Sequence, residues 1–171
     1  MKSIVFSLVA AGGAALLAPS ALGAGPALQV CGPQVSVEEL LRQINAARAA
    51  GHRCGGRAMG PATPLQWDAA LYSAAQGHSL DMAKRNYFEH RSPEGVDVAA
   101  RASAVRYPWK SVGENIAAGA RSMPDAVQNW LESPGHCENI MNPAFSDVAV
   151  ACVAQPGTQW GTYWTMVLGR K

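Results

Sequence analysis

The chain has 171 residues, of which 49% are hydrophobic and 15% are charged, with a formal net charge of +2. This length is typical of one ordinary domain, and the apolar content is sufficient for a core of its own. Because the positive and negative charges nearly balance, the composition does not indicate a nucleic-acid partner.

The N-terminus predicts a secretory signal peptide. Lys2 supplies a positive charge, residues 4–17 form an apolar run, and small residues follow at positions 18–24. That run is shorter than the roughly 20 residues that span a bilayer, which favours a cleaved signal over the alternative of an uncleaved membrane anchor. We expect residues 1–24 to be removed, leaving residues 25–171 as a single secreted or periplasmic domain with no transmembrane anchor.

Four cysteines lie after the predicted signal: Cys31, Cys54, Cys137 and Cys152. An even number in an exported chain indicates disulfides, and four cysteines allow three connectivities. We expect the pairs Cys31–Cys54 and Cys137–Cys152, because each pair brackets one local unit and closes a short loop. A zinc ribbon or finger is the competing interpretation, but the chain has no CxxC pair.

The first half of the chain predicts two long helices. Ser36 and Glu39 form a capping box, and the apolar residues behind them recur at helical spacing to about residue 49. Residues 51–64 are rich in glycine and proline, so we expect a loop there. Asp68 is a suitable N-cap for a second helix that ends near residues 85–86.

In the second half of the chain, the spacing of apolar residues changes from helical to strand-like near the C-terminus. We expect a turn at residues 90–95, a short helix at 97–103 and an irregular stretch after it. A further helix begins at residues 122–125 and stops before Pro134, since proline restricts the residue that precedes it. Residues 147–154 and 160–168 read as two strands that residues 155–159 join in a hairpin.

The polar residues that could carry chemistry are His90, Glu114, Glu132 and His136. Two imidazoles and two carboxylates suit a divalent metal site or acid–base catalysis, although their spacing alone is not diagnostic. His78 falls on the apolar face of the second predicted helix, where we expect a hydrogen-bonded core histidine.

Four motifs occur in order, at residues 86–90 (Asn-Tyr-Phe-Glu-His), 113–117 (Gly-Glu-Asn-Ile-Ala), 130–143 (which contains Ser-Pro-Gly-His-Cys-Glu-Asn) and 163–167 (Tyr-Trp-Thr-Met-Val). In this combination they resemble the bacterial branch of the CAP superfamily (cysteine-rich secretory protein, antigen 5, pathogenesis-related 1), which shares an SCP-like extracellular domain. The resemblance extends over about residues 36–169.

This resemblance implies an α+β fold, a three-layer α-β-α sandwich with a small, mostly antiparallel sheet between helices. It also implies a cleft lined by a His/Glu tetrad, which in some relatives holds zinc or another divalent cation. His90, Glu114 and His136 match three members of that tetrad. The eukaryotic spacing puts the fourth member at Ser133, and Glu132 is the neighbouring carboxylate.

The leading hypothesis is a secreted, monomeric binding module rather than an enzyme. Its cleft would hold a divalent cation and a small apolar or lipid ligand. The alternative is a metal-dependent, peptidase-like hydrolase in which the histidines hold zinc and Glu114 activates the bound water. A structural or host-interaction protein with a relic site is a third reading.

Overall fold

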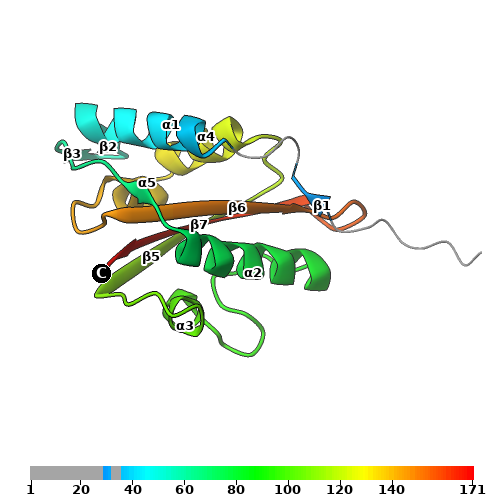
Figure 1. Ribbon diagram of the computed structural model, residues 1–171. Helices are drawn as coiled ribbons and strands as arrows, with labels where there is room; N and C mark the ends of the chain where they lie inside the picture. The colour runs from blue at the N-terminus through cyan, green and yellow to red at the C-terminus, as the bar shows by residue number, and fades with distance from the viewer. Residues whose placement is uncertain (1–28, 32–35) are drawn as a thin grey trace, which may run out of the picture.

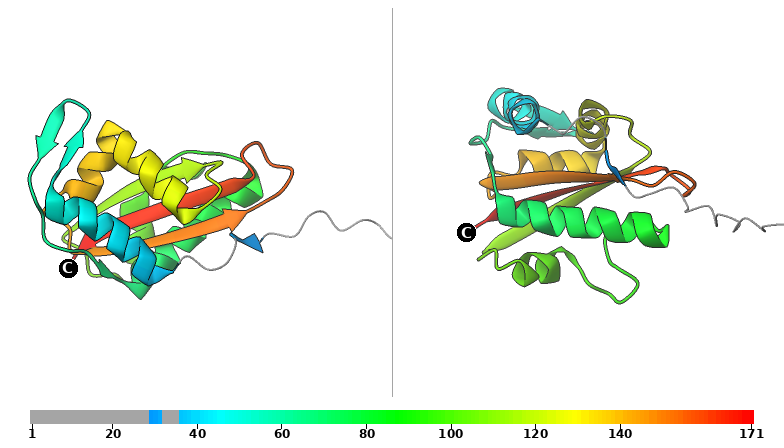
Figure 2. Two further views of the ribbon diagram at one scale, coloured as in Figure 1. Left: turned by 90° about the horizontal axis from the view of Figure 1, so that it is seen from above. Right: turned by 45° about the vertical axis from the view of Figure 1, so that its right-hand side comes forward.

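The computed structural model describes residues 29–31 and 36–171, so the predicted signal peptide at residues 1–24 lies outside the described residues. A five-stranded sheet separates two layers of helices (Figure 1). One face carries α1 (Val37–Ala50), α4 (Met123–Glu132) and α5 (Pro134–Met141), and the other carries α2 (Ala69–Arg85) and α3 (Val98–Ala104). The views in Figure 2 show the same two layers on either side of the sheet. The expected α+β three-layer sandwich is therefore confirmed.

Three long strands form the body of the sheet: β5 (Ser111–Ala118), β6 (Asp147–Ala154) and β7 (Thr162–Arg170). β7 lies in the middle, antiparallel to both β6 and β5. The short strands β1 (Gln29–Val30) and β4 (Gln66–Trp67) pair with β6, β1 antiparallel and β4 parallel. β6 and β7 are buried along nearly their whole length because helices cover both faces, which explains their almost continuous apolar sequence.

Local capping sets the helix starts where the sequence predicts them. The side chain of Ser36 accepts a hydrogen bond from the amide of Glu39, and Asp68 does the same for Leu71. Pro134 ends α4 as expected, but it also begins α5, a helix that the apolar periodicity did not predict. Proline suits this position because its missing N–H would have no partner in the first helical turn.

Two further segments differ from the sequence-based prediction. Residues 51–64 contain a hairpin, β2 (His52–Cys54) paired with β3 (Arg57–Met59), rather than an unstructured loop. Gly55 adopts a φ of 58° in its two-residue turn, a conformation that glycine adopts without steric cost. β5 is the second difference, since the sequence pattern predicts no strand between the short helix at 97–103 and α4.

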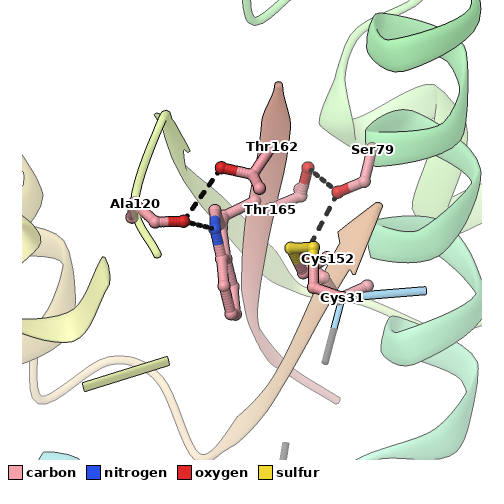
Figure 3. Close-up of a disulfide and its surroundings, with 8 residues drawn as sticks. Cys31, Ser79, Ala120, Cys152, Thr162 and Thr165 are labelled. Atoms are coloured by element: carbon pink, nitrogen blue, oxygen red, sulfur yellow. Dashed lines mark hydrogen bonds between the residues drawn. A yellow bond between two sulfur atoms is a disulfide. The ribbon is translucent and has the colours of Figure 1, made fainter. Parts of the chain in front are cut away.

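The predicted disulfide pairing is wrong. The bridges join Cys31 to Cys152 and Cys54 to Cys137, across 121 and 83 residues, with Cα–Cα distances of 5.4 and 5.3 Å. β1 lies beside the end of β6, so Cys31 meets Cys152 and its amide donates to the Cys152 carbonyl at 3.3 Å. Figure 3 shows this bridge, which joins β1 to β6. Sheet and helix packing, rather than closeness in sequence, selects the partners.

The second bridge has a parallel cause. The β2–β3 hairpin packs against α5, so Cys54 meets Cys137 on the first turns of that helix. No helix within the described ranges is long and apolar enough to cross a membrane.

Candidate functional site

A buried carboxylate on β5 forms the centre of the candidate site. The side chain of Glu114 is 3% exposed and lies where β5 passes between the helical layers. Gly113 precedes it, and a Cβ at that position would lie 2.8 Å from the ring of Phe145. The glycine of the Gly-Glu-Asn motif therefore lets the chain pass close to this ring without displacing it.

Both oxygens of Glu114 have short contacts. Oε1 accepts from Nδ1 of His90 at 2.9 Å, and Oε2 accepts from Nη2 of Arg101 at 2.6 Å. The Arg101 side chain is only 10% exposed, so the two opposite charges compensate one another away from water. A buried carboxylate is tolerated when it is paired and hydrogen-bonded in this way.

Arg101 also organises the segment that carries His90. Its Nη2 donates to the backbone carbonyl of His90 at 2.9 Å, and its Nη1 donates to the carbonyl of Val96 at 2.8 Å. One guanidinium on α3 thus holds both the backbone of His90 and the carboxylate to which the His90 ring is bonded. The sequence analysis missed this residue because an arginine on a short helix is usually a solvated charge.

His78 lies behind the carboxylate as a core histidine, in agreement with the prediction. The residue is 1% exposed, and its Nε2 lies 3.0 Å from the carbonyl oxygen of Glu89 and 3.8 Å from Oε1 of Glu114. A carbonyl only accepts, so Nε2 donates to it and carries the proton. Burial lowers the pKa of His78, which keeps the ring neutral near pH 7.

His90 and His136 face each other at the surface of the site. Their ring centroids are 6.5 Å apart. The hydrogen bond to Glu114 raises the pKa of His90, whereas burial, and then the nearby His90, lower the pKa of His136. As the pH rises, His136 therefore loses its proton before His90 does.

Two asparagines hold the helix of His136 against β5. Asn115 Nδ2 donates to the carbonyl of His136 at 3.0 Å. Asn139 Nδ2 donates to the backbone carbonyl of Glu114 at 3.2 Å and to Oδ1 of Asn115 at 2.9 Å. The asparagines of the motifs at 113–117 and 130–143 thus form one network that fixes His136 relative to the carboxylate.

The fourth predicted residue takes a different position. Glu132 is exposed at the end of α4, where it accepts from Nε2 of Gln128 at 2.5 Å on its own helix. Within residues 29–31 and 36–171, no three His, Cys, Asp or Glu side chains are grouped so that they could hold one metal ion. The structure therefore brings His90 to Glu114, places His136 opposite His90, and leaves Glu132 in contact with its own helix.

Chemically, the arrangement orients an imidazole. With Nδ1 of His90 hydrogen-bonded to a carboxylate, the lone pair of the neutral ring lies on Nε2, as in the carboxylate–histidine pairs of metal sites. The His90 side chain is 56% exposed, so its ring is open to a ligand from solvent.

Comparison with known proteins identifies similar chains. The family model for the cysteine-rich secretory protein family, CAP, matches residues 41–168. YkwD of Bacillus subtilis (strain 168) is 36% identical over 102 residues, which cover 60% of this chain and 38% of YkwD. The membrane protein YlbC of the same organism is 35% identical over 86 residues, or 50% of this chain and 25% of YlbC. The chain thus spans well under half the length of these two curated relatives.

Solved structures share the fold. An extracellular SCP-domain protein from Bacillus anthracis str. Ames superposes with a TM-score of 0.64 at 28% identity, over 78% of this chain and 40% of that chain. An outer surface protein from Borrelia burgdorferi has a TM-score of 0.63 at 17% identity, over 78% of this chain and 91% of that one. The second likeness concerns the fold alone.

Proposed function

Because this chain belongs to the cysteine-rich secretory protein (CAP) family, we propose that it is an extracellular binding module in which His90 and His136 hold a divalent cation such as zinc. The proposal for the compartment draws on the predicted signal peptide and on the extracellular SCP-domain protein of Bacillus anthracis, which has the same fold.

The observation that carries the cation proposal is the hydrogen bond from Nδ1 of His90 to Glu114. A carboxylate in this position fixes the tautomer and the orientation of a metal-binding imidazole and makes it a better ligand. Arg101 holds the other oxygen of Glu114, so the carboxylate has a defined orientation of its own. In this proposal Glu114 acts through His90, and Glu132, which is bonded within α4, takes no part.

The two rings fit a shared cation after a small adjustment. On one tetrahedral zinc, the centroids of two imidazoles lie roughly 5 Å apart, compared with 6.5 Å between His90 and His136. The side chain of His90 is more than half exposed, so its ring can tilt towards His136 while Nδ1 stays bonded to Glu114. The lowered pKa of His136 favours the neutral form that a metal requires. Water would complete the coordination, so we expect weaker binding than at a site with four protein ligands.

The geometry favours binding over hydrolysis. A metal-dependent hydrolase would use a carboxylate with a free oxygen as the base for the metal-bound water. Both oxygens of Glu114 are engaged, one by His90 and one by Arg101. We therefore prefer the binding module, while the apolar or lipid ligand and the monomeric state stay predictions.

The test is isothermal titration of zinc into the untagged protein at pH 7. We expect saturable binding by the wild type, and binding at least about tenfold weaker by the His90→Ala/His136→Ala double variant. His52→Ala is the matched control, since His52 lies on β2 and is not one of the proposed ligands, so its removal should leave the affinity unchanged. Equal affinities of the wild type and the double variant would refute the proposed site.

A further inference from the structure

We propose that the groove between α2 and α3 binds a small neutral molecule that has an apolar body and one hydrogen-bond acceptor. The groove has a volume of about 380 Å³, within the size range of small-molecule sites. Arg101 lines it and also bonds Glu114, but neither His90 nor His136 is among its lining residues, so the groove does not depend on the cation.

Small and apolar side chains form its walls. Ala74 and Gly77 line it from α2, while Ala104 and Val105 line it from the end of α3. Val96 stands at its rim and is one of the two large hydrophobic residues that the described chain exposes, at 40%. Such walls suit the hydrocarbon part of a ligand.

Gly77 keeps this space open. It occupies the middle of the 17-residue helix α2, where glycine is less favourable than alanine. A Cβ at Gly77 would meet no atom of another segment within 4 Å, so neither packing nor a positive φ requires glycine there. The absence of a side chain at Gly77 leaves the groove wider.

Arg101, which lines the groove, also carries a hydrogen-bond donor that has no acceptor in the described part of the chain. Nη1 and Nη2 of this side chain are bonded to backbone carbonyls and to Glu114. The Nε of Arg101 is buried and has no partner among the described residues. Unsatisfied buried donors are unfavourable, so a ligand that brings an acceptor to Nε gains the hydrogen bond and removes that penalty.

Charge selects a neutral ligand. The guanidinium of Arg101 is already compensated by Glu114. At the mouth of the groove, Arg85 is paired with both Asp81 and Glu94. With Glu114 there are three carboxylates to two arginines, so an anionic ligand finds no uncompensated positive charge, whereas an alcohol or carbonyl oxygen does not need one.

The segment at residues 92–96 borders the groove through Ser92, Glu94 and Val96. Glu94 joins this segment to α2 through its ion pair with Arg85, and the Glu94 side chain is 62% exposed. Exposed ion pairs contribute little to stability. The carbonyl of Val96 also accepts from Nη1 of Arg101 at 2.8 Å, so a ligand that reaches Nε has to displace part of the segment at residues 92–96, which keeps the expected binding weak.

Cyclohexanol is a suitable probe, since it has an apolar ring and one hydroxyl acceptor. We would titrate it into the ¹⁵N-labelled full chain and follow the Arg101 Nε–H resonance by NMR. We expect a saturable shift of that resonance and of the amides that line the groove, with a Kd in the millimolar range. Cyclohexanecarboxylate should bind more weakly.

Gly77→Leu tests the site directly, because its side chain would fill the groove while the helix gains a better helix former. It should weaken cyclohexanol binding at least about tenfold. Lys84→Leu places the same side chain on an exposed position of α2 outside the groove and should bind as the wild type does. No saturable shift at Arg101 Nε–H, equal binding by Gly77→Leu, or tighter binding of the carboxylate would each overturn the proposal. Zinc titration of Gly77→Leu should match the wild type, so the two proposals fail independently.

Discussion

Removing the guanidinium of Arg101 should be among the most damaging single changes near the site. Arg101→Met keeps much of the apolar stem but leaves Glu114 buried, with a 3% exposed side chain and no positive partner except His90 when that ring is charged. Breaking a buried ion pair from one side typically costs about 3–5 kcal/mol. Two carbonyls, of His90 and Val96, also lose a donor, but both belong to exposed residues that water can reach. We therefore expect a loss of about 3–5 kcal/mol in the free energy of unfolding at pH 7.

A double-mutant cycle separates the ion pair from the other contacts of Arg101. Glu114→Gln combined with Arg101→Met removes both charges, so the double variant should lose less than the sum of the single changes, by about 2–3 kcal/mol. The exposed pair Arg42–Glu39 provides the matched control and should show a much smaller coupling that salt screens.

Urea unfolding, followed by circular dichroism, measures each corner of the cycle. For a chain of this size a change of 1 kcal/mol shifts the Tm by about 2–4 °C, so Arg101→Met should melt roughly 6–20 °C below the wild type. A stability equal to that of the wild type, or a coupling no larger than that of the surface pair, would show that Arg101 is not a structural partner of Glu114.

Two further predictions concern the disulfides and the histidines. Peptide mapping without reduction should recover the Cys54–Cys137 bridge, and a bridge from Cys54 to any other cysteine would contradict the structure. The Cys54→Ala/Cys137→Ala double variant should lower the free energy of unfolding by about 2–4 kcal/mol. In the metal-free protein, NMR titration should give a pKa above the ordinary value of about 6.5 for His90 and below it for His136. Because the folded pKa of His90 is raised, its interaction with the carboxylate stabilises the fold below about pH 6.5 and is lost as the pH rises through the raised pKa. The reverse order of the two histidines would refute the assignment.

Much of the candidate site could be found from motifs. His90, Glu114 and His136 lie in short segments whose order resembles the family pattern, and the structure gathers all three at one place. Arg101 and the contact between Glu114 and His78 could not be found in this way. Both depend on how α2 and α3 pack against β5, and neither residue stands in a distinctive local pattern.

The α+β class followed from the resemblance of the motifs to a known family, whereas the local sequence determined the starts of α1 to α4 and the β6–β7 hairpin. These features depend on neighbours within a few residues: a capping hydroxyl or carboxylate three residues before an amide, a proline that breaks a helix, and an apolar run of strand length. Short-range hydrogen bonds and sterics act in the same way wherever the segment lies in the fold.

Only the tertiary structure decided the disulfide partners, the strand β5 and the surroundings of the buried carboxylate. Cys31 meets Cys152 because β1 joins the edge of β6, and Cys54 meets Cys137 because a hairpin packs on α5. The chain separation of two cysteines says little about their distance once a sheet has formed, since strand pairing brings remote segments to within hydrogen-bonding distance. The same packing turns an arginine on a short helix into the partner of Glu114, because burial of the carboxylate makes a compensating charge necessary.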